Sequence, residues 1–230
     1  MDAAGHVPIV TIDGPSGSGK GTISREVARR LGWHLLDSGA LYRLVALSGG
    51  RQGLAPDDEV GHSRLARAMN VEFGGDDRGE ERICLDRDDV TREVRSEMAG
   101  QGASRVAAWP PVREALLERQ RAFARPPGLV ADGRDMGTVI FPAADLKIFL
   151  TASAEERALR RYKQLKEKGS GANLAALSRE IAERDQRDST RKVAPLKPAP
   201  DARIVDSTGM SIAQVVESVL SEGRSRGLWG

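Results

Sequence analysis

The short segment GPSGSGKGT, residues 14 to 22, has residue types and spacing suited to holding phosphate groups. Gly14, Gly19 and Lys20 fit the pattern G-x-x-x-x-G-K, in which backbone N–H groups surround phosphate oxygens and the lysine reaches the β- and γ-phosphates. A β-branched run precedes the segment and an amphipathic pattern follows it, so the N-terminus of a helix would add positive potential. The residues predicted to bind ATP are Gly14, Pro15, Ser16, Gly17, Ser18, Gly19, Lys20, Gly21 and Thr22.

The residue after the lysine departs from the commonest form of this loop. Gly21 stands where Ser or Thr is usual, and the hydroxyl comes one position later, at Thr22. This shift argues against a Mg²⁺ site of the GTPase kind, and no N-K-x-D guanine signature occurs in the chain. A switch GTPase is therefore disfavoured.

Two polar segments follow predicted strands, where open α/β sheets place their ligands. They are DSGALYR at 37–43, which offers Ser38, Tyr42 and Arg43, and DGRDMGT at 132–138, which offers Asp132, Arg134 and Asp135. Asp132 comes first after the apolar strand and is the candidate carboxylate on the metal side. Helix capping and turn stabilisation alone remain the alternative explanation for both segments.

The run ERDQRDSTRK, residues 183–192, contains seven charged side chains in ten positions. If the preceding helix continues, Leu177 and Ile181 mark its buried stripe, and Arg184, Asp188 and Arg191 fall on the same stripe. The alternatives are a solvated face or i,i+4 pairing, which contributes only about 0.3–0.5 kcal/mol in water and does not explain this phase. We predict that the charges line a site for an anionic ligand.

Arg113 and Ser104 are further candidates. Arg113 shares a helical stripe with Leu116 and Leu117, so it is expected to face inward, where an unpaired guanidinium is costly. A bound phosphate is one partner that would offset that cost.

The order of elements around these residues predicts an α/β fold with a five-stranded parallel sheet flanked by helices. The expected core strands are VPIVTI, WHLLD, GLVADGRD, DLKIFLTA and ARIVDST. Helices are expected at about 22–31, at about 41–49, and in a segment that begins at Pro110-Pro111. Two more are expected over about 154–192, with a turn at GSGAN, and over SIAQVVESVL. Residues 64–102 are predicted to form an insertion, with antiparallel strands NVEFGG and ERICLD around the turn GDDRGE and a helix over 91–109. The terminal GRSRGLWG looks like a loose tail.

Composition excludes several classes of protein. The net charge of +2 over 230 residues, with no Lys/Arg-rich block, does not suggest a nucleic-acid footprint. Residues 155–192 hold eleven Lys/Arg against seven Asp/Glu, a local +4, which suits a compact anionic ligand. The single Cys84, with no signal peptide and no long apolar run, favours a soluble cytoplasmic protein without membrane contact. The three scattered histidines, His6, His34 and His62, are not expected to be ligands or bases.

Six segments in this order resemble bacterial cytidylate (CMP) kinases over about residues 7–220. They are GPSGSGKGT, LLDSGALYR, the insertion around GDDRGE, VREALLERQRAF, ADGRDMGT and ERDQRDSTRK…PL. Gly21 before Thr22 agrees with that family. The resemblance implies a P-loop kinase that transfers the γ-phosphoryl group of ATP to CMP or dCMP with Mg²⁺. Asp132 is the candidate protein carboxylate for this ion, in contact through water. The even charge and the lack of an obvious apolar seam favour a monomer.

The resemblance also implies an arrangement of parts. Residues 1–63 and 103–230 would form the core, with a mobile lid at about 155–190, and residues 64–102 would bind the monophosphate. Its catalytic residues would be Lys20, Arg160, Arg161 and Arg184. Its CMP-binding positions match Ser38, Tyr42, Arg43, Ser104, Arg113, Arg134, Asp135, Arg184, Asp188 and Arg191.

Individual roles follow the family. Ser104, Arg113 and Asp135 would meet the cytosine ring, Arg43 and Arg134 the acceptor phosphate, and Asp188 the sugar. Two other classes remain open: a P-loop kinase for UMP, AMP or shikimate, and a nucleotide-binding regulator without turnover.

Overall fold

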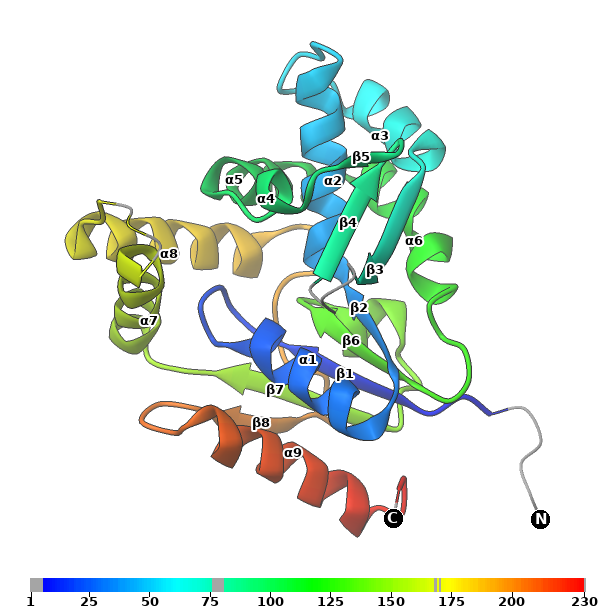
Figure 1. Ribbon diagram of the computed structural model, residues 1–230, viewed down its shortest axis with the longest axis vertical. Helices are drawn as coiled ribbons and strands as arrows, with labels where there is room; N and C mark the ends of the chain where they lie inside the picture. The colour runs from blue at the N-terminus through cyan, green and yellow to red at the C-terminus, as the bar shows by residue number, and fades with distance from the viewer. Residues whose placement is uncertain (1–5, 76–80, 168, 170, 230) are drawn as a thin grey trace. The chain divides into compact units, whose positions relative to one another are not determined.

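A computed structural model describes residues 6–75, 81–167, 169 and 171–229. The chain, shown as a ribbon in Figure 1, divides into two compact units. Unit 1 comprises Met1–Asp37 and Arg121–Gly230, and unit 2 comprises Ser38–Gln120. Among the described residues, no helix combines the length and the apolar character that crossing a bilayer requires.

A five-stranded parallel sheet forms the centre of unit 1, in the order β2-β6-β1-β7-β8, which confirms the predicted fold class. The apolar β-branched runs become buried strands, as expected for a parallel sheet covered by helices. The strands are β1 Ile9–Asp13, β2 His34–Asp37, β6 Leu129–Gly133, β7 Leu146–Thr151 and β8 Arg203–Asp206.

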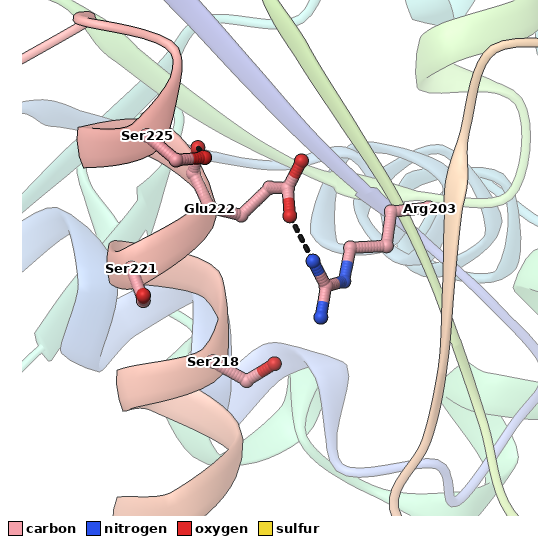
Figure 2. A pocket seen from close by; sticks show the side chains of 5 residues that line it. All are labelled: Arg203, Ser218, Ser221, Glu222 and Ser225. Atoms are coloured by element: carbon pink, nitrogen blue, oxygen red, sulfur yellow. Dashed lines mark hydrogen bonds and ion pairs between the residues drawn. The ribbon is translucent and has the colours of Figure 1, made fainter.

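The helices of unit 1 are α1 Lys20–Leu31, α7 Ala154–Glu167, α8 Leu174–Thr190 and α9 Ile212–Ser225, with a π-helical turn η1, Met136–Ile140. Helix α1 ends at Gly32, whose φ of 66° lets its N–H reach the carbonyls of Ala28 and Arg29. At the sheet edge, β8 and α9 outline a pocket of about 350 Å³ (Figure 2). None of the predicted site residues lines this pocket. Its lining consists of Arg203, Ser218, Ser221, Glu222 and Ser225.

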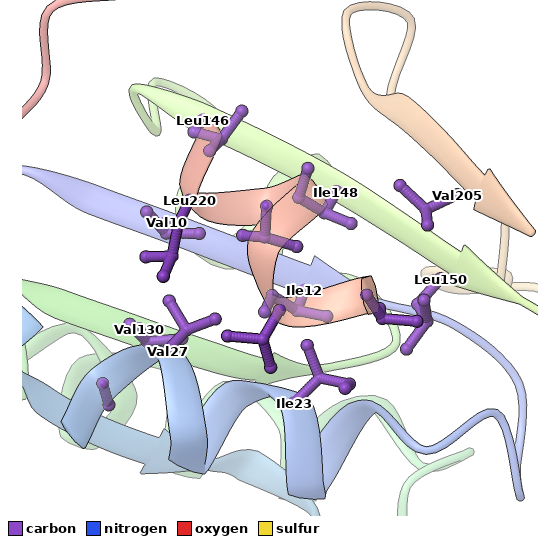
Figure 3. Close-up of a cluster of buried hydrophobic side chains, with 14 residues drawn as sticks. Val10, Ile12, Ile23, Val27, Val130, Leu146, Ile148, Leu150, Val205 and Leu220 are labelled. Carbon is purple, nitrogen blue, oxygen red and sulfur yellow. The ribbon is translucent and has the colours of Figure 1, made fainter. Parts of the chain in front are cut away.

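The core of unit 1 lies between the sheet and helices α1 and α9 (Figure 3). Alternate residues of β1, such as Val10 and Ile12, point to the same side as Ile148 of β7, because side chains of a strand alternate between faces. Ile23 and Val27 of α1 meet them at i, i+4 spacing, as the sequence pattern predicts. This packing fixes the strand ends and the start of α1, which carry the candidate site.

Unit 2 contains helices and a small antiparallel sheet in the order β3-β4-β5. Its strands confirm the predicted antiparallel pair, with Phe73 opposite Ile83, whereas the turn residues 76–80 lie outside the described part of the chain. Helix α3 and strand β5 were not predicted. The elements are α2 Ser38–Arg51, α3 Glu59–Ala68, β3 Val71–Gly75, β4 Glu81–Leu85, β5 Asp88–Asp89, α4 Thr91–Val94, α5 Glu97–Val106 and α6 Pro110–Arg121.

Two helices differ from the sequence prediction. The helix expected over 91–109 is interrupted, because the Ser96 hydroxyl accepts a hydrogen bond from the backbone N–H of Ala99 and starts the second helix. Helix α2 begins at Ser38, about one turn before the predicted start at residue 41. Its first turn is already packed, because Ala40 is fully buried.

The prediction of a loose C-terminal tail is wrong for the described residues up to 229. The ring of Trp229 meets Trp33 edge to face at 5.4 Å, and its indole N–H donates to the carbonyl of Leu220. A Cβ on Gly223 would lie 1.8 Å from the Trp229 ring. The glycine therefore makes room for the ring and does not mark a flexible linker.

Unit 2 is larger than the predicted insertion 64–102 and includes it. The predicted lid, about 155–190, covers α8 and all of α7 except its first residue. The assignment of the insertion to monophosphate binding and of α7 and α8 to a mobile lid stays a prediction.

Candidate active site

The glycine-rich loop connects the carboxyl end of β1 to the first turn of α1, as the sequence predicts. At two positions of this loop the structure requires glycine. A Cβ on Gly14 would lie 2.0 Å from the carbonyl oxygen of Leu150, and Gly19 caps α1 with a φ of 90°, in the left-handed region that glycine tolerates. Ser18 is almost fully buried, and its Oγ has no hydrogen-bond partner among the described residues.

Lys20 is buried at the start of α1, and its Nζ donates to the carbonyl of Pro15 at 3.1 Å. Burial lowers the pKa of Lys20 to about 7, and the charges of Arg134 and Arg184 lower it further, against the opposing effect of Asp132 and Asp188. A buried ammonium beside two guanidinium groups favours a nearby anion, because an anion relieves both the desolvation and the repulsion.

Three aspartates lie at the carboxyl ends of adjacent strands: Asp13 and Asp37 are the last residues of β1 and β2, and Asp132 is the residue before the last of β6. In the parallel register Asp132 is opposite Ile12 and Asp37. A Cβ on Gly21 would lie 3.2 Å from Oδ2 of Asp132, so a serine there would crowd the carboxylate. The absence of a side chain at position 21 thus lets Asp132 approach the first turn of α1.

Asp13 is a polar residue of this edge that was not predicted. Its two carboxylate oxygens accept hydrogen bonds from the backbone N–H groups of Met136 and Gly137, each at 2.8 Å. Burial raises the pKa of Asp13 to about 7, against the lowering effect of these two bonds. The bonds attach the DGRDMGT segment, which carries Arg134 and Asp135, to the strand that leads into the P-loop.

Arg134 and Asp188 form a partly buried ion pair, with Nε of Arg134 2.9 Å from Oδ2 of Asp188. Burial raises the pKa of Asp188, but Arg134, Arg184 and Arg191 outweigh it and hold that pKa below its usual range. The carboxylate is therefore ionised at neutral pH and surrounded by three cations.

The charged stripe of α8 has the predicted phase. Leu177, Ile181 and Asp188 are its buried residues, and Arg184 is half-buried, whereas Arg187 is exposed on the other side. A solvated charge run would show the opposite pattern. The prediction that the inward stripe becomes charged is confirmed for Arg184 and Asp188. Arg191 was expected on the same stripe of a continuing helix, but α8 ends at Thr190 and Arg191 is its C-cap, with a non-helical ψ of 134°.

The arginines of α7 hold the backbone of the P-loop. Arg160 donates to the carbonyl of Ser18 at 3.2 Å and to the carbonyl of Ser207 at 2.6 Å. Arg157, which was not predicted, is buried and donates to the carbonyl of Ser16. Arg161 donates to the side chain of Gln164 within α7.

Unit 2 brings together the other predicted residues, on three of its helices. Tyr42 and Arg43 come from α2, where Nη1 of Arg43 donates to the carbonyl of Val94 at 2.8 Å. Arg113 of α6 is buried, as predicted, and its Nη1 lies 3.3 Å from the hydroxyl of Tyr42. Ser104 of α5 is also buried, and its Oγ has no hydrogen-bond partner among the described residues.

Sequence comparison identifies the family. A family model described as Cytidylate kinase matches residues 10–225. The chain belongs to the cytidylate kinase family. A protein named Cytidylate kinase from Pseudomonas fluorescens (strain SBW25) is 59% identical over 224 residues, which are 97% of this chain and 98% of the relative. Another with that name, from Azotobacter vinelandii (strain DJ / ATCC BAA-1303), is 58% identical over 223 residues, 96% and 97% of the two chains.

The similarity of this chain to solved structures is low in both sequence identity and TM-score, and it does not indicate the acceptor. A shikimate kinase from Acinetobacter baumannii in complex with shikimate has a TM-score of 0.45 and 14% identity, and the match covers 97% of this chain and 96% of that one.

For this member of the cytidylate kinase family, sequence reasoning missed Asp13, Arg157 and Asp185 as parts of the site. Signals for two of them were present. Asp13 is a carboxylate at the end of a strand that is otherwise apolar, and Asp185 lies four residues after Ile181 on the buried stripe. Arg157 had no comparable signal, because its role depends on contacts with Ser16 and Asp185, which are distant in sequence.

Proposed function

We propose that this cytidylate kinase family member transfers the γ-phosphoryl group of ATP to the 5′-phosphate of CMP or dCMP, giving ADP and CDP or dCDP. The observation that carries the proposal is the buried Lys20 of the P-loop, whose pKa is lowered by burial and by Arg134 and Arg184. Two guanidinium groups, from the end of β6 and from α8, thus act on the ammonium of the P-loop, as expected where several phosphates must be held.

The donor would bind at the P-loop. Backbone N–H groups from Ser16 to Gly21, at the N-terminus of α1, would offer hydrogen bonds to phosphate oxygens, and Lys20 would reach the β- and γ-phosphates. The unpartnered hydroxyl of Ser18 supports this assignment.

Each unit contains residues of its own that are proposed to contact the acceptor. In unit 1 Arg134 is proposed to hold the acceptor phosphate, Asp135 the base and Asp188 the sugar, with Arg184 and Arg191 as further contacts. In unit 2 the proposed contacts are Ser38, Tyr42, Arg43, Ser104 and Arg113. The buried, unpartnered Oγ of Ser104 supports a polar ligand there, because a buried hydroxyl without a partner is costly.

A divalent cation, Mg²⁺, would be held mostly by phosphate oxygens and water, with Asp132 as the protein carboxylate, in contact through water. The space left by Gly21 beside Oδ2 of Asp132 fits this arrangement. Among the described residues no group of three His, Cys, Asp or Glu side chains could hold a metal. The ion would neutralise charge on the phosphates.

Transfer needs little acid–base chemistry, so the residues would act by position and charge. An oxygen of the acceptor phosphate forms a bond to the γ-phosphorus while the bond from that phosphorus to the β,γ-bridging oxygen breaks, and ADP leaves. Lys20 and Arg184 would neutralise charge on the transferring group, with Arg160 and Arg161 as the further candidates. Closure of the lid over the site would exclude water and limit hydrolysis of ATP.

A coupled assay for ADP release with a panel of acceptors tests the proposal. The expected result is that CMP and dCMP support turnover well above UMP, AMP and shikimate. A preference for one of the other acceptors would assign a different kinase activity. Nucleotide binding without ADP release for any acceptor would support a regulator instead.

The protein is further proposed to act as a monomer in the cytoplasm, without nucleic-acid or membrane partners. Light scattering after size-exclusion chromatography checks the monomer, for which the expected mass is 24.8 kDa.

A further inference from the structure

The guanidinium group of Arg157 joins three separate parts of unit 1. Its Nη1 donates to the carbonyl of Ser16 in the P-loop at 3.0 Å, and its Nε donates to the carbonyl of Ala152 at 3.0 Å. Its Nη2 lies 2.7 Å from Oδ2 of Asp185 on α8. The side chain of Arg157 is 6% exposed, so these contacts are made largely away from water.

The P-loop also packs directly against this residue. A Cβ on Gly17 would lie 3.1 Å from Cβ of Arg157 and 3.3 Å from its carbonyl oxygen. The backbone of the loop thus touches α7 at Gly17 and is hydrogen-bonded to it at Ser16. A change in the loop when phosphates bind must therefore be accommodated by Arg157.

On the other side, Asp185 belongs to the helix that carries the charged stripe. It follows Arg184 directly and precedes Asp188 by three residues, close to one helical turn. Because a helix moves as a rigid element, a displacement at Asp185 also moves Arg184 and Asp188. Asp188 is in turn bonded to Arg134 at the end of β6.

Stability alone is a weak reason for such a contact. A largely buried ion pair recovers little of its desolvation cost, and a well-packed apolar pair of similar volume is often equally stable. The planar guanidinium can hold a carboxylate and two carbonyl groups in fixed directions at once, which a lysine cannot do. The arrangement suits a residue that sets positions.

We propose that Arg157 and Asp185 are positioning residues that couple phosphate binding at the P-loop to the placement of Arg184 and Asp188. The donor and acceptor nucleotides then bind with positive cooperativity. This inference rests on the proposed function, since it assigns the P-loop to the donor and the α8 stripe to the acceptor.

The experiment measures the dissociation constant of CMP by calorimetry, alone and in the presence of saturating ADP. The ratio of the two constants is the coupling factor, and reciprocity requires the same factor for ADP with and without CMP. Wild-type protein is expected to show a factor of about 5 or more, within the usual range for coupled sites. In Asp185→Asn the factor is expected to fall towards 1, while each nucleotide alone binds within about threefold of wild type, a change small beside such a coupling.

Glu183→Gln is the matched control. It removes one carboxylate from the same helix, and within the described part of the chain the ion pair that it affects is an exposed one with Arg187, at 4.0 Å. It is expected to keep the wild-type factor. Asp185→Glu, which restores the charge, is expected to recover part of the coupling.

Four results would overturn the inference: a wild-type factor of 1, an unchanged factor in Asp185→Asn, an equal loss in Glu183→Gln, or weaker binding of both nucleotides at a constant factor. If Asp185→Asn does not fold, Arg157→Lys replaces it, with the same expectation and the same contradicting results. Turnover of CMP by the wild-type sample is measured in parallel. Absent turnover contradicts the proposed function, whereas normal turnover with unchanged coupling contradicts only this inference.

Discussion

Nε of Arg134 donates to Oδ2 of Asp188 at 2.9 Å, which connects the end of β6 to α8 across 54 positions of sequence. Both side chains are largely buried, and Arg184 and Arg191 add two further positive charges around the carboxylate. The pair therefore presents an ionised acceptor next to several donors. Such a mixed site suits a sugar hydroxyl and a phosphate group of one nucleotide.

Asp188→Ala is expected to reduce turnover of CMP and dCMP far more than it weakens ATP binding. The physical reason is that Asp188 is proposed to accept from the sugar of the acceptor, whereas the donor lies on the P-loop. Steady-state kinetics and direct titration of ATP measure the two effects. Arg187→Ala, at an exposed position of the same helix, is the control. Equal weakening of ATP binding would place Asp188 on the donor side.

Arg184→Ala is expected to lower kcat by about 10³–10⁵, the range for an arginine that stabilises charge on a transferring phosphoryl group. Arg184 is half-buried on the inward stripe, and its charge acts on Lys20. The measurement is kcat at saturating ATP and CMP, with circular dichroism to verify folding. A decrease of less than tenfold in a folded variant would remove Arg184 from this role.

Binding of ATP at pH 8 is expected to take up close to one proton. The pKa of Lys20 is about 7, below its ordinary value of 10.5, so the free enzyme carries mostly neutral Lys20 at pH 8. Bound phosphates favour the charged form and raise that pKa, and affinity should accordingly fall as the pH rises above 7. Calorimetry in buffers of different ionisation enthalpy counts the protons. Proton release, or the same uptake in Lys20→Arg, would contradict the prediction.

Asp13→Asn is expected to change how stability depends on pH. The folded-state pKa of Asp13 is about 7, raised from 3.8, so the folded protein binds more protons than the unfolded chain between these values. The contribution of Asp13 to stability is therefore largest at low pH and is lost as the pH rises through about 7. The unfolding free energy of wild type relative to Asp13→Asn should fall by about 2–3 kcal/mol from pH 5 to pH 8. Urea titrations measure it, and a constant difference would contradict the assignment.

The parts of the fold that sequence predicts well are those with local causes. Gly32 ends α1 because glycine adopts the left-handed conformation at a helix C-terminus, and the strand leading into Gly14 follows from its β-branched residues. The inward position of Asp188 was predictable because Leu177 and Ile181 fix the rotation of α8. Arg113 was placed correctly by its distance from Leu116.

Features that depend on distant contacts were not predictable. The bonds from Met136 and Gly137 to Asp13 span more than 120 positions, and nothing near Asp13 in sequence indicates them. The position of Trp229 similarly depends on its contact with the distant Trp33. Because the sequence near Trp229 does not indicate this contact, its segment was predicted to be a loose tail. The break at Ser96 is different: its capping hydroxyl is a local signal, hidden by the helical pattern on both sides.

The central claim is transfer of the γ-phosphoryl group of ATP to CMP, and ³¹P NMR of a mixture of the enzyme, ATP, Mg²⁺ and CMP tests it most directly. The account predicts that signals of the two phosphorus atoms of CDP grow in equal amount with those of ADP, without inorganic phosphate, and that Lys20→Met abolishes them. Formation of ADP and inorganic phosphate while CMP stays unchanged would contradict it.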